Sequence, residues 1–276
     1  MKPLEVGVAS WSLKLPTPEK VFAKLEEMGI RVVQYGPLLA TGRVEEAADE
    51  LAAARAAHES VAISALMVGW AGEDYSSIEA IHRTGGYGDP ATAESRVADT
   101  MAALEVAGRL GVGVVSLHIG FVPADASEPG YGRMVGIVQR IGEKAADCGA
   151  VFAMETGQET AEELLEFLKA VDRPAVKINF DPANMILYGR GEPLAALRRL
   201  GGHVAHVHAK DATASDQPGV TWGAEVPLGT GAVDLPAFVS ELKSLGYKGP
   251  LVIEREAGPQ PFADIADGKR LLESLV

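Results

Sequence analysis

The sequence contains a single cysteine, Cys148, among its 276 residues. An intramolecular disulfide is therefore excluded, and such cysteine usage is typical of a reducing compartment. The first residues, Met1 to Trp11, show no basic start followed by a long apolar stretch and a small-residue cleavage site, which are the marks of a secretory leader. We therefore expect a cytoplasmic protein.

Positive charge and long apolar runs are also scarce. The chain has 25 lysines and arginines against 38 aspartates and glutamates, a formal net charge of −13. This balance repels polyphosphates and leaves no basic surface for nucleic acid, so we expect no nucleic-acid partner. The longest apolar run, from Val61 to Ala71, is well short of the roughly 18 residues of a membrane span, so we expect no membrane partner either.

Hydrophobic residues, by contrast, make up 47% of the chain. They occur in apolar, β-branched runs that alternate with helical patterns, which is typical of a parallel sheet with crossover helices. The length suits eight β/α units, which take about 250 residues. We predict the α/β class and a single (β/α)8 TIM barrel over residues 1–276, with strands at Leu4–Ser10, Arg31–Tyr35, Ala62–Val68, Gly113–His118, Val151–Glu155, Val176–Asp181, His203–His208 and Leu251–Glu254.

Four long connections follow predicted strands. In a β/α barrel, the loops after the strands build the active-site face. The first connection is rich in glycine and aromatic residues, and we expect it to form a mobile cover over the site; the alternative is an ordinary surface loop. The four connections are residues 69–90, 119–129, 182–191 and 212–231.

Four polar side chains lie at the ends of four successive predicted strands: Glu155, Asp181, His208 and Glu254. In a barrel, strand ends meet on one face, and three carboxylates with one imidazole suit a divalent cation. The sequence therefore predicts a metal site made of these four residues. The alternative is that the strand-end carboxylates only cap the helices that follow them.

The sequence around these residues resembles the sugar phosphate isomerase/epimerase family of the xylose-isomerase-like TIM barrels, which includes D-tagatose 3-epimerase-like enzymes and endonuclease four. The resemblance spans nearly the whole chain. It implies one divalent metal ion (manganese, magnesium, cobalt or zinc) at the same four residues, with Glu155 and Glu254 also acting as an acid/base pair through an enediolate. The motifs that carry it are residues 154–159, 179–184, 206–211 and 249–254.

Two further histidines are candidates for the site. His206 and His208 lie two residues apart on one predicted strand, so both side chains point the same way. We predict that His206 orients a metal-binding carboxylate from one layer deeper; a hydrogen-bonded core histidine is the alternative. His118 ends the fourth predicted strand, where family members often place a substrate-contacting or metal-binding histidine. We predict that it contacts substrate, with a core or loop hydrogen bond as the alternative.

Four more residues are predicted to bind substrate. Lys210 follows His208 and could bind a phosphate or stabilise an enediolate oxygen, or it could lie in a surface ion pair. Trp11, Trp70 and Phe121 lie near the ends of predicted strands, where an aromatic face can pack on the apolar face of a sugar. The alternative for each of the three is packing at the mouth of the barrel.

The chain departs from the family pattern at two places. D-tagatose 3-epimerase-like enzymes carry a histidine three residues after the metal aspartate, where this chain has Asn184. An amide can hydrogen-bond a sugar hydroxyl but cannot shuttle a proton, so we predict substrate binding by Asn184. Endonuclease four needs further aspartate and histidine ligands, and residues 222–229 offer only Glu225. Together with the net charge, this disfavours DNA repair.

The leading hypothesis is a metal-dependent isomerase or epimerase of a small carbohydrate or keto-sugar. The first alternative is a keto-sugar or inosose dehydratase or lyase on the same metal site. The second is a non-catalytic sugar-binding protein or partner subunit, against which the retention of all four ligand types argues. Barrels of this type often dimerise, so a homo-oligomer is compatible with the sequence.

Overall fold

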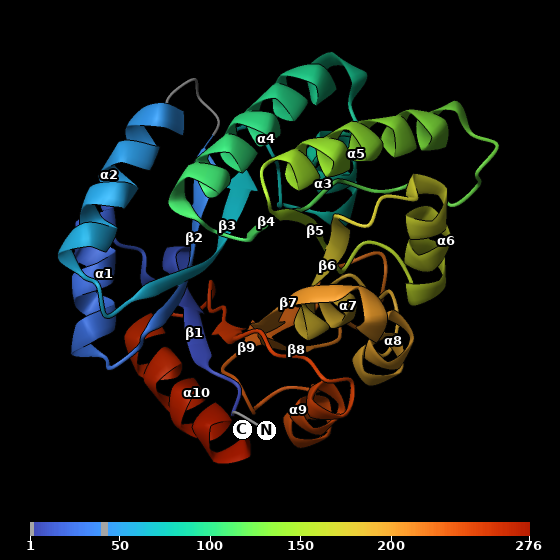
Figure 1. Ribbon diagram of the computed structural model, residues 1–276. Coiled ribbons are helices and arrows are strands. Elements are labelled where there is room, and N and C mark those ends of the chain that lie inside the picture. Colours follow the sequence, from blue (N-terminus) through green and yellow to red (C-terminus); the bar gives the residue numbers. More distant parts are fainter. Residues whose placement is uncertain (1–2, 40–43) are drawn as a thin grey trace.

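Eight parallel strands close into a barrel in the computed structural model, which describes residues 3–39 and 44–276 (Figure 1). Their order around the barrel is β1-β10-β7-β6-β5-β4-β3-β2, so each strand lies beside its neighbour in the sequence of β/α units. The predicted TIM-barrel fold is confirmed. The strands are β1 (Val6–Ala9), β2 (Val32–Leu39), β3 (Ala62–Gly69), β4 (Val114–Leu117), β5 (Val151–Glu155), β6 (Val176–Phe180), β7 (Val204–Ala209) and β10 (Leu251–Ile253).

Helices surround the barrel (Figure 1). Many helices begin at a proline, whose missing N–H costs nothing in the first turn. Thr160 and Glu163 form a reciprocal capping box at the start of α6. The helices are α1 (Pro18–Glu27), α2 (Val44–Ala57), α3 (Ile78–Thr84), α4 (Pro90–Leu110), α5 (Pro129–Asp147), α6 (Ala161–Val171), α7 (Pro182–Leu187), α8 (Pro193–Leu200), α9 (Leu235–Ser244) and α10 (Pro261–Leu275).

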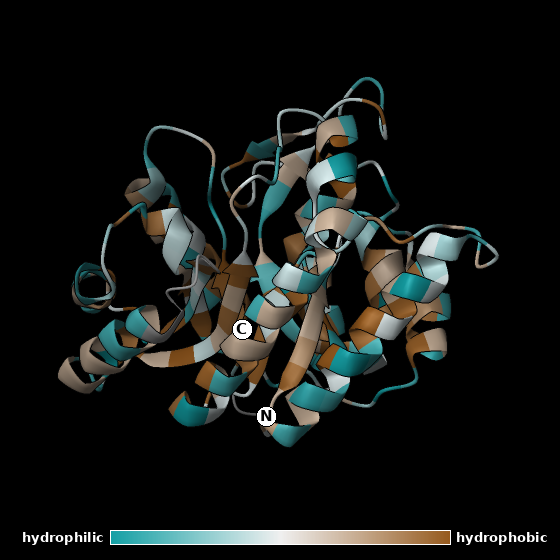
Figure 2. Cartoon of the chain, turned by 90° about the horizontal axis from the view of Figure 1, so that it is seen from above, coloured by the Kyte–Doolittle hydropathy of each residue, from teal (hydrophilic) through white to brown (hydrophobic). Residues whose placement is uncertain are grey.

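The core lies inside the barrel and between the barrel and its helices. Figure 2 shows hydrophobic residues concentrated on the strands and polar ones on the loops and outer helix faces. Val8, Phe152 and Phe180 on the strands and Phe22 and Leu51 on the helices are fully buried. Each such side chain contributes about 1.5–3 kcal/mol to folding. Within the described residues, no helix is both long and apolar enough to cross a membrane.

The long connections after the strands are more ordered than the sequence indicated. The first contains α3, the third contains α7, and the fourth contains a two-stranded antiparallel sheet of β8 (Asp211–Thr213) and β9 (Ala224–Val226). The Asp211 carboxylate organises the fourth connection because it accepts hydrogen bonds from four backbone N–H groups. These belong to Ala212 and Val233 at Oδ1 and to Gly229 and Gly231 at Oδ2.

The first connection, which we predicted to be a mobile cover, is anchored at one end. Arg96 donates to the carbonyl oxygens of Thr84 and Gly86 at 2.8 and 2.5 Å. Arg133 donates to the carbonyl oxygens of the two residues that follow Gly86, at 2.8 and 2.5 Å. Residues 84–88 of the connection are therefore fixed to α4 and α5, and the mobility of the cover stays a prediction.

Candidate metal centre

The four predicted metal ligands lie on four strands that are adjacent in the barrel, in the order β5, β6, β7 and β10. Glu155 ends β5, Asp181 follows β6, His208 lies in β7, and Glu254 follows β10. Because the strands are parallel and in register, their carboxyl ends meet at one place. One ligand atom of each residue lies within 4.8 Å of the others, and all four residues are buried.

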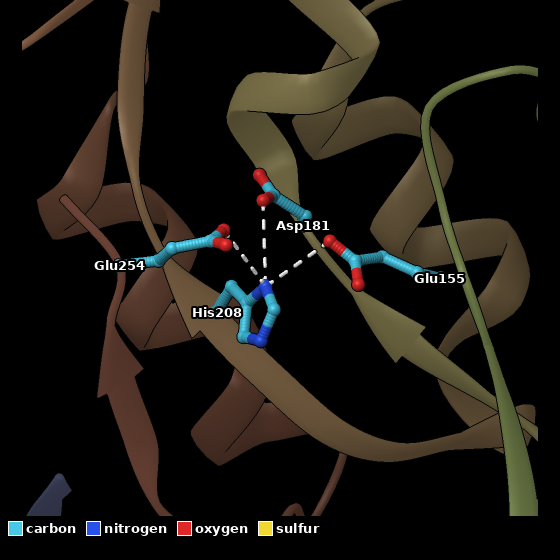
Figure 3. A group of neighbouring side chains, drawn as sticks. All are labelled: Glu155, Asp181, His208 and Glu254. Atoms are coloured by element: carbon cyan, nitrogen blue, oxygen red, sulfur yellow. Dashed lines mark ion pairs between the residues drawn. The ribbon is translucent and has the colours of Figure 1, made fainter. Parts of the chain in front are cut away.

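The three carboxylates converge on one nitrogen of the imidazole (Figure 3). His208 Nδ1 lies 3.1 Å from Glu254 Oε2, 3.3 Å from Glu155 Oε1 and 3.5 Å from Asp181 Oδ2. His208 Nδ1 and Asp181 Oδ2 are buried without a hydrogen-bond partner. Buried polar atoms without partners are costly unless something else binds them. Three carboxylate oxygens and one imidazole nitrogen are the donor set that a divalent cation requires, so these residues fit a metal ion.

The two oxygens of Asp181 have separate roles. Oδ1 accepts hydrogen bonds from the backbone N–H groups of Ala183 and Asn184 at 2.8 and 3.0 Å, which caps α7. Oδ2 points at His208. The capping alternative considered for the strand-end carboxylates therefore describes one oxygen of Asp181 and leaves the other for a metal. Pro182 at the first helical position starts the helix immediately after the strand.

The two glutamates have different hydrogen-bond partners. Glu254 Oε1 accepts from the indole N–H of Trp11 at 2.7 Å, and Oε2 accepts from the Lys210 ammonium at 3.0 Å. Glu155 Oε1 accepts from the Asn184 amide at 3.0 Å and lies 3.5 Å from His118 Nε2. Each carboxylate is thus held in place by two side chains. Such hydrogen bonds fix the orientation of a metal-binding carboxylate.

The charged groups in the cluster shift one another's pKa values. Burial alone would lower the pKa of His208, but the Glu254 and Glu155 carboxylates raise it well above its usual value. Burial disfavours ionised Glu254, yet the charges of Lys210 and His208 hold its pKa well below the usual range. Burial raises the pKa of Asp181. A cation bound at His208 Nδ1 would replace the proton there, because a ligating imidazole nitrogen carries none.

A buried polar layer supports the cluster from below. His206 Nδ1 lies 3.0 Å from Asn179 Oδ1, and Asn179 Nδ2 lies 3.4 Å from Glu155 Oε2. His206 therefore reaches a carboxylate only through Asn179. Burial lowers its pKa to about 3, so it stays neutral. Gln34 was not among the residues predicted for the site, yet its Oε1 lies 2.6 Å from His208 Nε2. The sequence feature that could have identified it is the polar amide of Gln34 within the largely apolar strand β2.

A cavity of about 770 Å³ opens beside the cluster. Small-molecule sites typically measure about 300–1,000 Å³. Five of the six predicted substrate-binding residues line it: Trp11, Trp70, His118, Asn184 and Lys210. Phe121 instead lines a neighbouring cavity of about 870 Å³ and packs against Tyr188, which borders both cavities.

The roof of the first cavity joins two connections. Trp222, from the fourth connection, donates its indole N–H to the carbonyl oxygen of Tyr75, from the first connection, at 3.1 Å. The Trp222 ring also packs edge-on against Tyr188, with ring centroids 4.6 Å apart. Trp222 and Tyr188 therefore line the cavity together.

Comparison with known families agrees with this geometry. The family model described as a xylose isomerase-like TIM barrel matches residues 22–275. The chain belongs to this family. The family resemblance drawn from the motifs is thereby confirmed. Among solved structures, a xylose isomerase domain protein from Planctomyces limnophilus is 36% identical, with a TM-score of 0.87 over 100% of this chain and 98% of that one.

Curated relatives match over a shorter range. An inosose dehydratase from Lacticaseibacillus casei is 24% identical over 160 residues, which are 51% of this chain and 53% of that protein. An L-ribulose 3-epimerase from Methylomonas sp. is 28% identical over 149 residues, or 51% of this chain and 48% of that protein. The chain spans about half the length of the curated relatives it matches. Both relatives are named as enzymes.

Proposed function

We propose that this protein is a divalent-metal-dependent isomerase or epimerase of a small keto-sugar, with Glu155 and Glu254 as the two proton carriers. The observation that carries the proposal is their placement. Their carboxylates approach His208 from opposite sides, within the same buried cluster (Figure 3). A sugar carbon held between them has one carboxylate available on each face, which is the arrangement that removal and return of a proton requires.

When bound, a divalent ion (manganese, magnesium, cobalt or zinc) supplies positive charge that stabilises negative charge developing on adjacent sugar oxygens. The chain's own residues do the rest. One glutamate removes the proton beside the carbonyl, and the other returns a proton on the opposite face. His118 and Asn184 border the cavity beside Glu155, where they can hydrogen-bond sugar hydroxyls. Trp11 keeps one oxygen of Glu254 in place.

The charges around the cavity favour an unphosphorylated substrate. Lys210 is the one lysine or arginine among the described residues that line the cavity. Its ammonium already donates to Glu254 and Glu256 at 3.0 and 3.1 Å. The other charged lining residues include Glu73 and Glu225, both carboxylates. A phosphate would therefore meet like charge and no unoccupied cationic partner.

A keto-sugar or inosose dehydratase is the second candidate. Elimination of water starts from the same proton removal but does not require return of the proton on the other face. Asn184, which donates to Glu155 Oε1, stands where the D-tagatose 3-epimerase-like enzymes carry an imidazole, so this chain has one proton carrier fewer in the cavity. The similarity to an inosose dehydratase points the same way.

Turnover in deuterated water separates the candidates. Metal-loaded protein is incubated with ketohexoses, keto-inositols and 3-keto-glycosides, each also as a phosphate ester where one can be made. A rearranged sugar carrying deuterium beside the carbonyl supports the isomerase or epimerase, and a product lighter by one water supports the dehydratase. Turnover without solvent exchange would refute the two-glutamate mechanism.

Variants test the two glutamates. Glu155→Gln and Glu254→Gln should each lower turnover by at least about a hundredfold, the typical contribution of a general acid or base. Glu159→Gln is the matched control, because Glu159 is also buried but does not border the cavity. Equal losses in all three variants would indicate general destabilisation and contradict the assigned roles.

A further inference from the structure

A chain of buried side chains links His208 to strands across the barrel. His208 Nε2 lies 2.6 Å from Gln34 Oε1 on β2, and Gln34 Nε2 donates to Ser116 Oγ on β4 at 2.8 Å. Strands β2 and β4 flank β3, which lies opposite β7 in the closed order of strands. All three side chains belong to fully buried residues. Water therefore does not compete for these hydrogen bonds.

The orientation of the Gln34 amide is set by its second partner. Its Nε2 faces Ser116 Oγ at 2.8 Å and also lies 4.0 Å from Met67 Sδ. The Ser116 hydroxyl has a further acceptor of its own in Met67 Sδ at 3.3 Å, so its oxygen is available to accept from Gln34. The amide oxygen of Gln34 consequently points at the imidazole and accepts the proton on Nε2.

A second amide competes for the same ring nitrogen. Asn179 Nδ2 lies 3.2 Å from His208 Nε2 and is held there because Asn179 Oδ1 bonds His206 Nδ1 at 3.0 Å. Asn179 offers a donor and would favour a ring with its proton on Nδ1. Gln34 offers an acceptor at 2.6 Å and favours a proton on Nε2. The shorter contact belongs to Gln34.

We infer that Gln34 is a positioning residue that holds the Nε2 proton of His208 in place, so that the proton displaced by a metal is the one on Nδ1, between the three carboxylates. The inference rests on the proposed metal site. A ligating histidine commonly donates its other N–H to an acceptor, and loss of such an acceptor typically costs about 10–100-fold in metal affinity. Gln34 also counteracts Asn179, whose amide N–H2 group favours a neutral ring with its proton on Nδ1. A ring protonated at Nδ1 cannot bind a metal through that atom.

Three variants isolate this effect. Gln34→Leu removes the acceptor, so Asn179 becomes the nearest partner of Nε2, and the neutral ring then keeps its proton on Nδ1 instead of on Nε2. Gln34→Glu restores an acceptor oxygen at the same reach. Thr100→Val is the matched control, because Thr100 is equally buried and its hydroxyl bonds Tyr87 at 2.7 Å, away from the metal centre.

The measurement is zinc affinity of the metal-free protein by titration calorimetry, with nitrogen NMR of 15N-histidine-labelled, zinc-loaded protein. We expect zinc affinity to fall about 10–100-fold in Gln34→Leu, to be retained in Gln34→Glu, and to be unchanged in Thr100→Val. In zinc-loaded wild type, the His208 signals should show the proton on Nε2. Should Gln34→Leu fail to fold, Ser116→Ala is the second variant: it frees the Gln34 amide to turn, and we expect it to weaken zinc binding severalfold.

Wild-type affinity in the folded Gln34→Leu variant, an equal loss in Thr100→Val, or a ring proton on Nδ1 in the zinc-loaded wild type would overturn the inference. In the fallback, wild-type affinity in Ser116→Ala would do the same. These outcomes are distinct from failure of the proposed function. Zinc binding that depends on Gln34 while no sugar exchanges a proton would support the inference and refute the function. Absence of any metal binding by the wild type would overturn both.

Discussion

Binding of a divalent metal should raise the thermal stability of this protein. In the native chain, three buried carboxylates face one imidazole nitrogen, with Asp181 Oδ2 and His208 Nδ1 unpartnered. The unfolded chain does not hold these groups together. A cation that binds only the native state stabilises it by RT ln(1 + [L]/Kd). The experiment therefore adds manganese, magnesium, cobalt or zinc to protein from which a chelator has removed metal.

The size of the effect follows from the chain length. At free metal about 1,000 times Kd, binding contributes about 4.1 kcal/mol. Unfolding entropy near 60 °C is about 2.1 cal/mol/K per residue, which for 276 residues gives about 0.6 kcal/mol/K. Dividing the binding free energy by the unfolding entropy gives a rise in Tm of about 7 °C. A tenfold lower free metal concentration should remove about 1.4 kcal/mol of this stabilisation, or about 2 °C.

Circular dichroism melts of the wild type and of Asp181→Asn supply the assay. The asparagine can keep its oxygen toward the N–H groups of Ala183 and Asn184, so α7 retains its cap. Its other atom becomes an N–H2 group, which donates hydrogen bonds and is a poor metal ligand. We expect the metal-induced rise in Tm to fall below about 2 °C in this variant. A wild type that none of the four metals stabilises, or a variant with the full rise, would refute the site.

Two further predictions concern buried carboxyl groups outside the metal centre. Asp211→Asn would leave two backbone N–H groups facing an amide N–H2, at a cost of about 3 kcal/mol in total, so the Tm of the metal-free protein should fall by about 5 °C. The metal-induced rise in Tm should persist in this variant, and its loss would contradict a purely structural role for Asp211. Burial raises the pKa of Glu159 to about 7, so the stability from its protonated form is present below the unfolded value of 4.5 and is lost as pH rises to about 7. In urea titrations, Glu159→Gln should therefore gain about 3 kcal/mol over wild type between pH 4.5 and pH 8, and an unchanged difference between these pH values would contradict this assignment.

The fold and the metal cluster were predictable because each rests on a repeated local pattern. A parallel barrel places the ends of all its strands on one face, so Glu155, Asp181 and His208, spaced by about one β/α unit, had to lie close together. The same argument reached Glu254 despite the long connection before it. Apolar runs of strand length were sufficient to place the eight strands, because their burial inside the barrel leaves few other arrangements.

The surroundings of the cluster were less predictable because they depend on contacts between distant loops. For Lys210 the sequence left two alternatives, a contact with a phosphate or an enediolate oxygen and a surface ion pair. Its ammonium is bonded to Glu254 and Glu256, which lie on a connection more than forty residues away. Phe121 was expected either to stack on a sugar or to pack at the mouth of the barrel, and the path of its connection places it beside the neighbouring cavity. Gln34 acts across the width of the barrel, a distance that no local pattern encodes.

The four ligands occupy one continuous arc of the barrel, β5 to β10, while Trp11, Met67, Trp70 and His118 on or after β1, β3 and β4 form the facing wall of the cavity. The N-terminal half of the chain therefore contributes part of the cavity wall but none of the four ligands. An exchange of loops in the N-terminal half would change that part of the wall and leave all four ligand residues in place. Gln34 and Ser116 are the restriction on such exchange, because a graft that omits them would alter the C-terminal half from a distance.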